Sequence, residues 1–175
     1  MRNNWYVLAV DTGRENSRIK EIRAYNEEKA INNILPFVPS KETFFKREKE
    51  VSVMFPGYVF VETEMDAYDF LDYVKKVRRM YRSFIDILRY GDSDEMAVRW
   101  EERLVLMQLM NHEWCIKAST GFKEGVRVKI VEGSLVRQEA KIQRVDRNKM
   151  EAWVEVDMMG RQALIKVGLQ FIEKA

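Results

Sequence analysis

Two side chains of the types that bind metals or act as nucleophiles, His112 and Cys115, lie three residues apart. The sequence contains one histidine and one cysteine in total. A zinc site needs three or four protein ligands, and a Cys–His nucleophile needs a base that a third group orients. Both residues also fall in a stretch without hydrophobic periodicity, so we expect neither a metal site nor a catalytic role here.

Other patterns that support enzymatic chemistry are weak. Gly121, Gly125 and Gly133 are separated by strand-like sequence and do not form a phosphate-binding loop. The acidic pairs Glu27-Glu28 and Glu101-Glu102 lie on expected helix faces or at helix starts, where solvation explains them. We therefore expect a protein that is not an enzyme and that needs no cofactor and no metal.

The composition is that of an ordinary soluble protein, with 175 residues, 46% hydrophobic and 33% charged. No apolar run approaches the roughly 20 residues of a membrane helix, and no signal-peptide pattern opens the sequence. A single cysteine rules out an intramolecular disulfide and fits a reducing cytosol. These features predict a cytoplasmic monomer that does not contact a membrane.

The first 110 residues alternate between strand and helix patterns. An apolar run at 5–10 predicts a buried central strand, and Pro36 and Pro39 predict an edge strand or extended arm at 35–47. Further strands are expected at 51–53, 58–61 and 84–88, and helices at 15–25, at 66–78 with Asp66 as N-cap, and from Trp100 onward. This order predicts an α+β fold, with helices packed on an antiparallel sheet.

The pattern changes after residue 110. Residues 111–121 have no periodicity and end in Ser119-Thr120-Gly121, which predicts a linker. Short alternating runs follow around Val128, Ile142, Val154 and Ile165, with turn residues between them. The expected organisation is an N-terminal domain at 1–110, a linker at 111–121 and a small β-barrel at 122–175.

Charge is unevenly distributed between these parts. Residues 1–110 carry 18 Lys and Arg against 19 Asp and Glu, whereas residues 121–175 carry 11 against 8. The small C-terminal part is therefore mildly basic, which is compatible with nucleic-acid binding but is also common on ordinary solvated surfaces.

Two groups of motifs resemble one known family. Trp5-Tyr6-Val7-Leu8 and Thr12-Gly13-Arg14-Glu15, followed about forty residues later by the run Met54 to Val61, resemble the N-terminal domain of NusG-type transcription elongation factors. The run Gly125 to Gly133, followed by Ala140-Lys141-Ile142 and Asp146-Arg147, resembles the KOW motif, a short SH3-like β-barrel. Together they span nearly the whole chain in the order that the family has.

The resemblance implies a surface that binds RNA polymerase. In the family, aromatic residues of this region line an apolar pocket that holds the polymerase clamp helices, and rigid aromatics are typical of interface hot spots. The matching residues here are Trp5, Tyr6, Phe55, Pro56 and Tyr58. Pro56 and Gly57 force a bend that brings Phe55 and Tyr58 together, and for Phe55 a role in the core remains equally open.

The KOW part departs from the family where Ser134, Arg137 and Ala140 replace a common proline and two glycines. This change puts in doubt the usual protein partners of the barrel, a ribosomal protein and a termination factor. The pattern most resembles the specialised paralogue LoaP, which implies an antiterminator whose barrel recognises a hairpin of nascent leader RNA. The candidate RNA-binding residues are Lys129, Arg137, Lys141, Arg144, Arg147, Lys149 and Trp153.

Trp153 alternates out of phase with Ala152, Val154 and Val156, so its ring is expected on the outer face as a stacking surface. Packing against the other domain or a neighbouring strand is the alternative. Two other functions stay open: a general NusG-type factor whose KOW domain binds proteins, and a stand-alone KOW protein that binds RNA or the ribosome.

Overall fold

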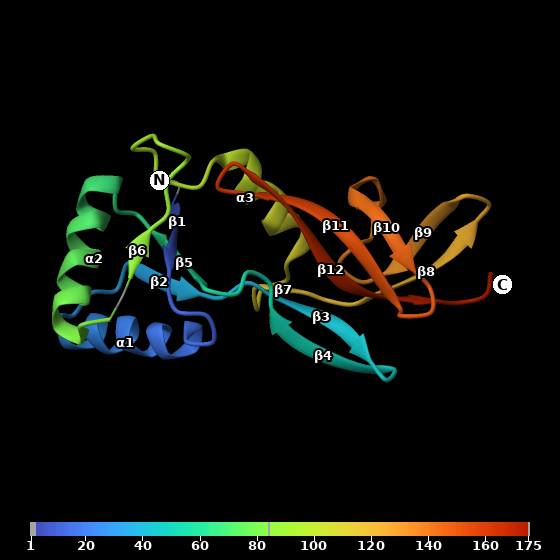
Figure 1. The fold of residues 1–175 in the computed structure, drawn as a ribbon, viewed down its shortest axis with the longest axis horizontal. Helices are drawn as coiled ribbons and strands as arrows, with labels where there is room; N and C mark the ends of the chain where they lie inside the picture. Colours follow the sequence, from blue (N-terminus) through green and yellow to red (C-terminus); the bar gives the residue numbers. More distant parts are fainter. Residues whose placement is uncertain (1–2, 84, 175) are drawn as a thin grey trace. The chain divides into compact units, whose positions relative to one another are not determined.

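The fold is described from a computed structural model that covers residues 3–83 and 85–174 (Figure 1). The chain divides into two compact units that do not follow the sequence order. Unit 1 contains Met1–Pro39 and Phe55–Trp100, and unit 2 contains Ser40–Met54 and Glu101–Ala175. The segment Ser40–Met54 thus belongs with the C-terminal part, although it interrupts the N-terminal one.

Unit 1 is built on a four-stranded antiparallel sheet with the order β2-β5-β1-β6. Its strands are β1 (Asn4–Ala9), β2 (Ile34–Phe37), β5 (Tyr58–Thr63) and β6 (Asp86–Ile87). The apolar run at 5–10 is the interior strand β1, and β2 with Pro36 lies at the edge, where a missing N–H is tolerated. Of the strand expected at 84–88, Phe84 lies outside the described residues.

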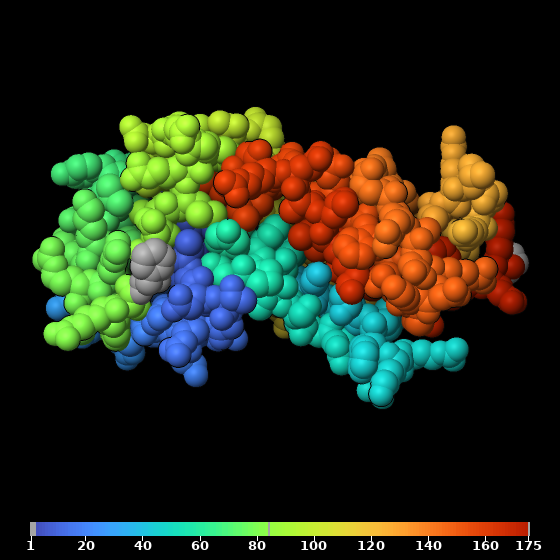
Figure 2. Space-filling view, in the orientation of Figure 1, coloured from blue at the N-terminus to red at the C-terminus, as the bar shows by residue number. Residues whose placement is uncertain are grey.

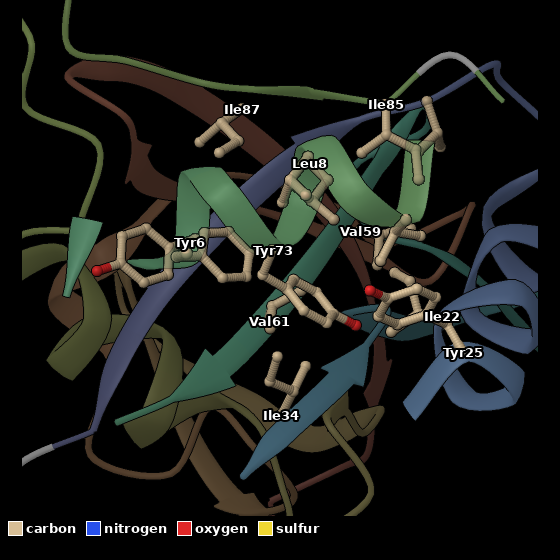
Figure 3. Packing of buried hydrophobic residues seen from close by; sticks show 14 of the residues in the cluster. Tyr6, Leu8, Ile22, Tyr25, Ile34, Val59, Val61, Tyr73, Ile85 and Ile87 are labelled. Carbon is tan, nitrogen blue, oxygen red and sulfur yellow. The ribbon is translucent and has the colours of Figure 1, made fainter. Parts of the chain in front are cut away.

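Helices α1 (Glu15–Glu28) and α2 (Ala67–Tyr81) pack on one face of this sheet. Asp66 caps α2 as expected, since its side chain accepts a hydrogen bond from the Asp69 amide at 2.9 Å. The alternate β1 residues Tyr6 and Leu8 point into the core that the helices cover, shown in Figure 3. The Tyr6 ring stacks on Phe70 of α2 at 4.3 Å between centroids.

The opposite face of the sheet carries a cluster of aromatic rings. Trp5 of β1 makes edge contacts with Phe37 at 5.1 Å and with Phe60 at 6.2 Å, and Phe55 stacks on Phe60 at 5.8 Å. Because strand side chains alternate between faces, Trp5 and Tyr6 serve two different cores despite being neighbours. Aromatic pairs of this geometry add about 0.5–1.5 kcal/mol each beyond area burial.

Unit 2 contains a three-stranded sheet with the order β4-β3-β7, formed by β3 (Ser40–Phe45), β4 (Glu48–Val53) and β7 (Cys115–Ile116). Strands β3 and β4 form a long hairpin (Figure 1). Helix α3 (Trp100–Leu109) contributes Glu102, whose carboxylate accepts hydrogen bonds from the Met159 and Gly160 amides at 2.9 and 2.8 Å.

The rest of unit 2 is a curled five-stranded sheet with the order β10-β11-β12-β8-β9. Its strands are β8 (Ser119–Glu124), β9 (Arg127–Glu132), β10 (Ile142–Asp146), β11 (Glu151–Met158) and β12 (Arg161–Phe171). Residues Glu139–Lys141 form a 3₁₀ turn. This small β-barrel and the helix-covered sheet confirm the α+β class expected from the sequence.

The expected linker at 111–121 contains β7 and the first residues of β8. Its sequence lacks periodicity because β7 is two residues long, too short to show alternation. The domain boundaries at 110 and 122 remain a prediction. Within residues 3–83 and 85–174, no helix is long and apolar enough to cross a bilayer, and no group of three or more metal-binding side chains occurs.

Candidate nucleic-acid interface

The bend at Pro56-Gly57 is held by a carboxylate from a distant motif. Glu15 at the start of α1 accepts hydrogen bonds from the Gly57 amide at 2.7 Å and the Gly13 amide at 3.2 Å. Gly57 has a φ of +86°, a conformation that L side chains rarely adopt, and its position leaves a Cβ only 3.1 Å from Thr12 Oγ1. The two N-terminal motifs are therefore one structural unit.

The electrostatics of Glu15 favour its ionised form. Burial acts to raise the pKa of Glu15, but the hydrogen bonds from the backbone amides of Gly57, of Glu15 itself and of Gly13 outweigh it, so this pKa lies below its ordinary value. A charged carboxylate that holds two amides fixes the path of the chain on both sides of the bend. This anchoring positions Pro56 and Tyr58 at the start of β5.

The five residues assigned to polymerase binding occupy different environments. Trp5 and Tyr6 are 1% and 0% exposed, and Phe55 is also buried. The Tyr6 hydroxyl donates to the Met65 carbonyl at 3.0 Å, and burial, together with Asp66, raises the pKa of Tyr6 to about 12. Pro56 is exposed and Tyr58 is half-buried. A partner can therefore touch Pro56 and Tyr58 directly, while Trp5, Tyr6 and Phe55 are packed in the interior of unit 1.

The turn between β10 and β11 presents two of the predicted RNA-binding cations. Asp146 Oδ1 accepts a hydrogen bond from the Lys149 amide at 3.0 Å, which closes the turn locally. Arg147 and Lys149 are exposed, and the Arg147 guanidinium lies 6.0 Å from the Phe171 ring. A turn that satisfies its own backbone leaves both side chains available to a partner.

Trp153 lies on the outer face of the barrel, as the alternation predicted. Ala152, Val154 and Val156 are buried, whereas Trp153 is half-buried between two cations. The Arg144 guanidinium lies 5.0 Å and the Lys166 ammonium 5.8 Å from its ring. The indole N–H is buried and has no hydrogen-bond partner among the described residues.

A groove with a volume of about 740 Å³ separates the β3–β4 hairpin from the barrel strands within unit 2. We call it the basic groove; it is lined by hairpin residues 44–47, by barrel residues 147–151, and by Lys166, Gln170 and Phe171. Five of these residues are cationic and one, Glu151, is acidic. In Figure 2 the cyan hairpin projects beside the orange strands that form the other side.

The positive charges around the groove influence one another. Lys41 of β3 is partly buried, and burial followed by the charge of Lys166 lowers the pKa of Lys41 against the opposing effect of Glu151. Glu151 also forms an ion pair with Lys166 at 3.5 Å. One carboxylate serving several cations leaves the groove with a positive potential, which attracts phosphate groups.

Several contacts fix the hairpin within unit 2. The buried Glu42 carboxylate accepts a hydrogen bond from the Ala118 amide at 2.9 Å and forms an ion pair with Lys117 at 3.2 Å. Phe44 lies so close to β12 that a Cβ on Gly168 would be 3.0 Å from its ring. Burial acts to raise the pKa of Glu42, but the Ala118 amide and Lys117 lower it below its ordinary value.

The structure separates the seven predicted RNA-binding residues into two groups. Arg147 and Lys149 line the basic groove, and Arg144 and Trp153 adjoin it through Lys166. Lys129 lies on β9, and Arg137 and Lys141 lie in the connection between β9 and β10; none of these three lines the groove.

The sequence interpretation missed the contribution of the hairpin. Lys41, Lys46, Arg47 and Lys166 were not among the candidates, although all four adjoin the basic groove. The signal available was Lys46-Arg47 directly after Phe44-Phe45, a basic and aromatic cluster. Its place beside the barrel depends on long-range packing that no local pattern records.

The fold is a helix-covered antiparallel sheet linked in sequence to a small basic β-barrel. The model of the family described as "Transcription termination factor nusG" matches residues 3–107. The chain belongs to the NusG family.

Individual relatives match over nearly the whole length. The transcription termination/antitermination proteins NusG of Staphylococcus carnosus and Staphylococcus aureus are 28% and 29% identical, over 97% of this chain and 94% of each relative. A solved structure of Thermotoga maritima NusG covers 97% of this chain and 94% of its own, with a TM-score of 0.50 and 23% identity. That likeness supports the fold.

Proposed function

We propose that this protein is a processive antitermination factor that binds RNA polymerase through its N-terminal part and nascent RNA through its KOW barrel. The basic groove of unit 2 carries the proposal, because it gathers five cationic side chains beside the exposed Phe45 ring and the half-buried Phe44 and Phe171 rings. Phosphate contacts supply most of the affinity of such interfaces, and arginine can hold a phosphate with two hydrogen bonds.

The polymerase surface of the proposal is the bend that Glu15 holds, with Pro56 and Tyr58 as the directly accessible residues. A rigid turn with an exposed proline and a half-buried tyrosine loses little conformational entropy when a partner covers it. The expected partner is an apolar helical element such as the clamp helices, in keeping with the family.

No covalent chemistry is required for this function. A factor that binds the elongating conformation of polymerase more tightly than the paused one shifts the population toward elongation. Binding of the barrel to a hairpin of the leader transcript would tether the factor to one class of operon. The tether raises the effective RNA concentration, so modest affinity in isolation is sufficient.

A second candidate function is a general NusG-type factor whose barrel binds a protein. The observation that favours it is an opening of about 580 Å³ beside β9 and β10, lined by Val126, Val128, Ile142 and Val145 among others. Val126 is fully exposed there. Exposed apolar residues at strand edges are common protein-binding surfaces.

The deciding experiment measures hairpin RNA binding as a function of salt for the wild type and for the triple variant Arg144→Ala, Arg147→Ala, Lys149→Ala. Each phosphate contact that is lost should flatten the dependence of log affinity on log salt by somewhat under one unit, about two units for the triple variant. A second triple variant, Lys129→Ala, Arg137→Ala, Lys141→Ala, removes the same charge from the three candidate residues outside the groove, and a smaller effect there would assign the RNA to the groove.

The same variants and Tyr58→Ala would then be compared in reconstituted transcription past a terminator. Tyr58→Ala should lower polymerase affinity about 30-fold, corresponding to about 2 kcal/mol, and abolish antitermination while the protein remains folded. Equal RNA affinities and salt slopes for the groove variant and the wild type would exclude RNA binding by this surface. Full activity of folded Tyr58→Ala would exclude the polymerase assignment.

A further inference from the structure

We propose that the β3–β4 hairpin forms the second side of the RNA site and that the basic groove holds unpaired nucleotides of the RNA, with a base stacked on Phe45. This inference rests on the proposed function and specifies which part of the RNA the groove accepts. It also assigns a binding role to a segment that interrupts the polymerase-binding part of the sequence.

The first observation is the exposure of Phe45. This ring is 57% exposed at the end of β3 and lines the groove. A large apolar side chain gains little from folding when more than half of it remains in water. The Lys46 ammonium lies 5.4 Å from the ring, so a stacked base would have a cation directly beside it for its phosphate.

The second observation is the backbone of the hairpin turn. Phe45 pairs with Glu48, so Lys46 and Arg47 form a two-residue loop, and both have positive φ, 49° and 67°. Turns of this type strongly prefer Asn-Gly, because side chains other than glycine and asparagine are strained there. Two cations at the two positions least suited to them indicate that their side chains are retained for binding.

The third observation is that cationic side chains line both sides of the groove. Lys46 and Arg47 of the hairpin face a side that carries Arg147, Lys149 and Lys166. A strand of RNA between these two sides would have cations for successive phosphates, as in single-strand binding channels.

The aromatic residues of the groove favour unpaired RNA over paired RNA. Bases in a duplex are stacked on one another and cannot stack on protein rings, whereas the bases of loops and bulges can. Phe45 and Phe171 both line the groove, and a volume of about 740 Å³ lies within the range of pockets that enclose small ligands. The groove is therefore suited to a few nucleotides of a hairpin loop or of a flanking single strand.

The test uses the full chain and three labelled probes of about 12 nucleotides, within the range of single-strand site sizes: oligouridine, oligothymidine and a blunt RNA duplex. Phe45→Leu keeps an apolar side chain but loses the ring, and should weaken oligouridine binding about tenfold. Duplex binding should not change. Phe45→Tyr, which keeps an aromatic ring, should bind oligouridine as tightly as the wild type. The matched control is Tyr68→Leu, at an exposed aromatic of α2.

The outcomes separate this inference from the proposed function. Loss of all RNA binding in the Arg144, Arg147 and Lys149 triple variant, with no effect of Phe45→Leu, would support the barrel site and overturn the role of the hairpin. Equal weakening of duplex and oligouridine by Phe45→Leu would overturn base stacking. Oligothymidine bound as tightly as oligouridine would overturn the assignment to RNA in favour of single-stranded DNA. A wild type that binds none of the probes, but still binds hairpin RNA in the salt titration, would overturn this inference and leave the proposed function standing.

Discussion

Two turns of the molecule, at Pro56-Gly57 and at Lys46-Arg47, differ in how well their residue types suit their backbone conformations. In the first, glycine occupies the left-handed position and Glu15 satisfies the amides, so residue type and backbone agree. In the second, lysine and arginine occupy left-handed positions and their side chains point to an open groove. Folding explains the first turn completely, whereas for the second we propose a bound partner as the explanation.

The largest effect on stability is expected when the turn at Pro56-Gly57 loses the Glu15 carboxylate that holds it. Glu15→Ala leaves the Gly57 and Gly13 amides without their acceptor, and hydrogen bonds to charged groups contribute about 1.5–3 kcal/mol each. We expect the free energy of unfolding to fall by about 3 kcal/mol in urea titrations. Glu27→Ala, an exposed glutamate of the same helix, should change it by less than about 0.5 kcal/mol.

The pH dependence of stability checks the same anchor. Because the folded-state pKa of Glu15 lies below its ordinary value near 4.5, its contribution is complete above that value and is lost as the pH falls through the lowered pKa. Glu15→Ala should therefore be less sensitive to acid than the wild type between neutral pH and about pH 3. An unchanged acid dependence would contradict an ionised anchor.

An intermediate effect of opposite sign is expected at the second turn. Replacing Lys46-Arg47 with Asn-Gly removes the strain of two positive φ angles and should raise the free energy of unfolding by about 1 kcal/mol. The same double variant should weaken oligouridine binding, because it removes two cations from the groove. A variant that gained no stability would show that this turn carries no strain, and the comparison between the two turns would fail.

The smallest effect concerns Trp153. Trp153→Phe keeps a ring beneath Arg144 and Lys166 but removes an indole N–H that has no partner among the described residues. The smaller ring buries less apolar area, which lowers stability, but removing an unsatisfied buried donor raises it. The free energy of unfolding should therefore change by less than about 1 kcal/mol. Thermal unfolding of Trp153→Phe and Trp153→Ala together would show this, since the alanine variant also loses the ring and should be clearly less stable.

Local patterns predicted most of the elements because they depend on periodicity and end signals. The alternation of Ala152 to Val156 placed Trp153 on the outer face, and Asp66 was identified as the cap of α2. The strand β7 escaped detection, since two residues carry no period. The binding surface was harder to predict: Trp5 and Tyr6 look like interface aromatics in the sequence, but both are buried.

The sequence by itself determined the α+β class, the C-terminal barrel and the basic turn at Arg147, because propensity, alternation and turn chemistry are properties of neighbouring residues. Only the tertiary structure decided that Glu15 holds Gly57, 42 residues away, and that the hairpin at Lys46 belongs to the barrel unit. The physical reason is that a buried carboxylate needs donors and an aromatic ring needs a surface such as Gly168, wherever in the chain they lie. The packing of the hairpin beside the barrel strands, within unit 2, creates the basic groove.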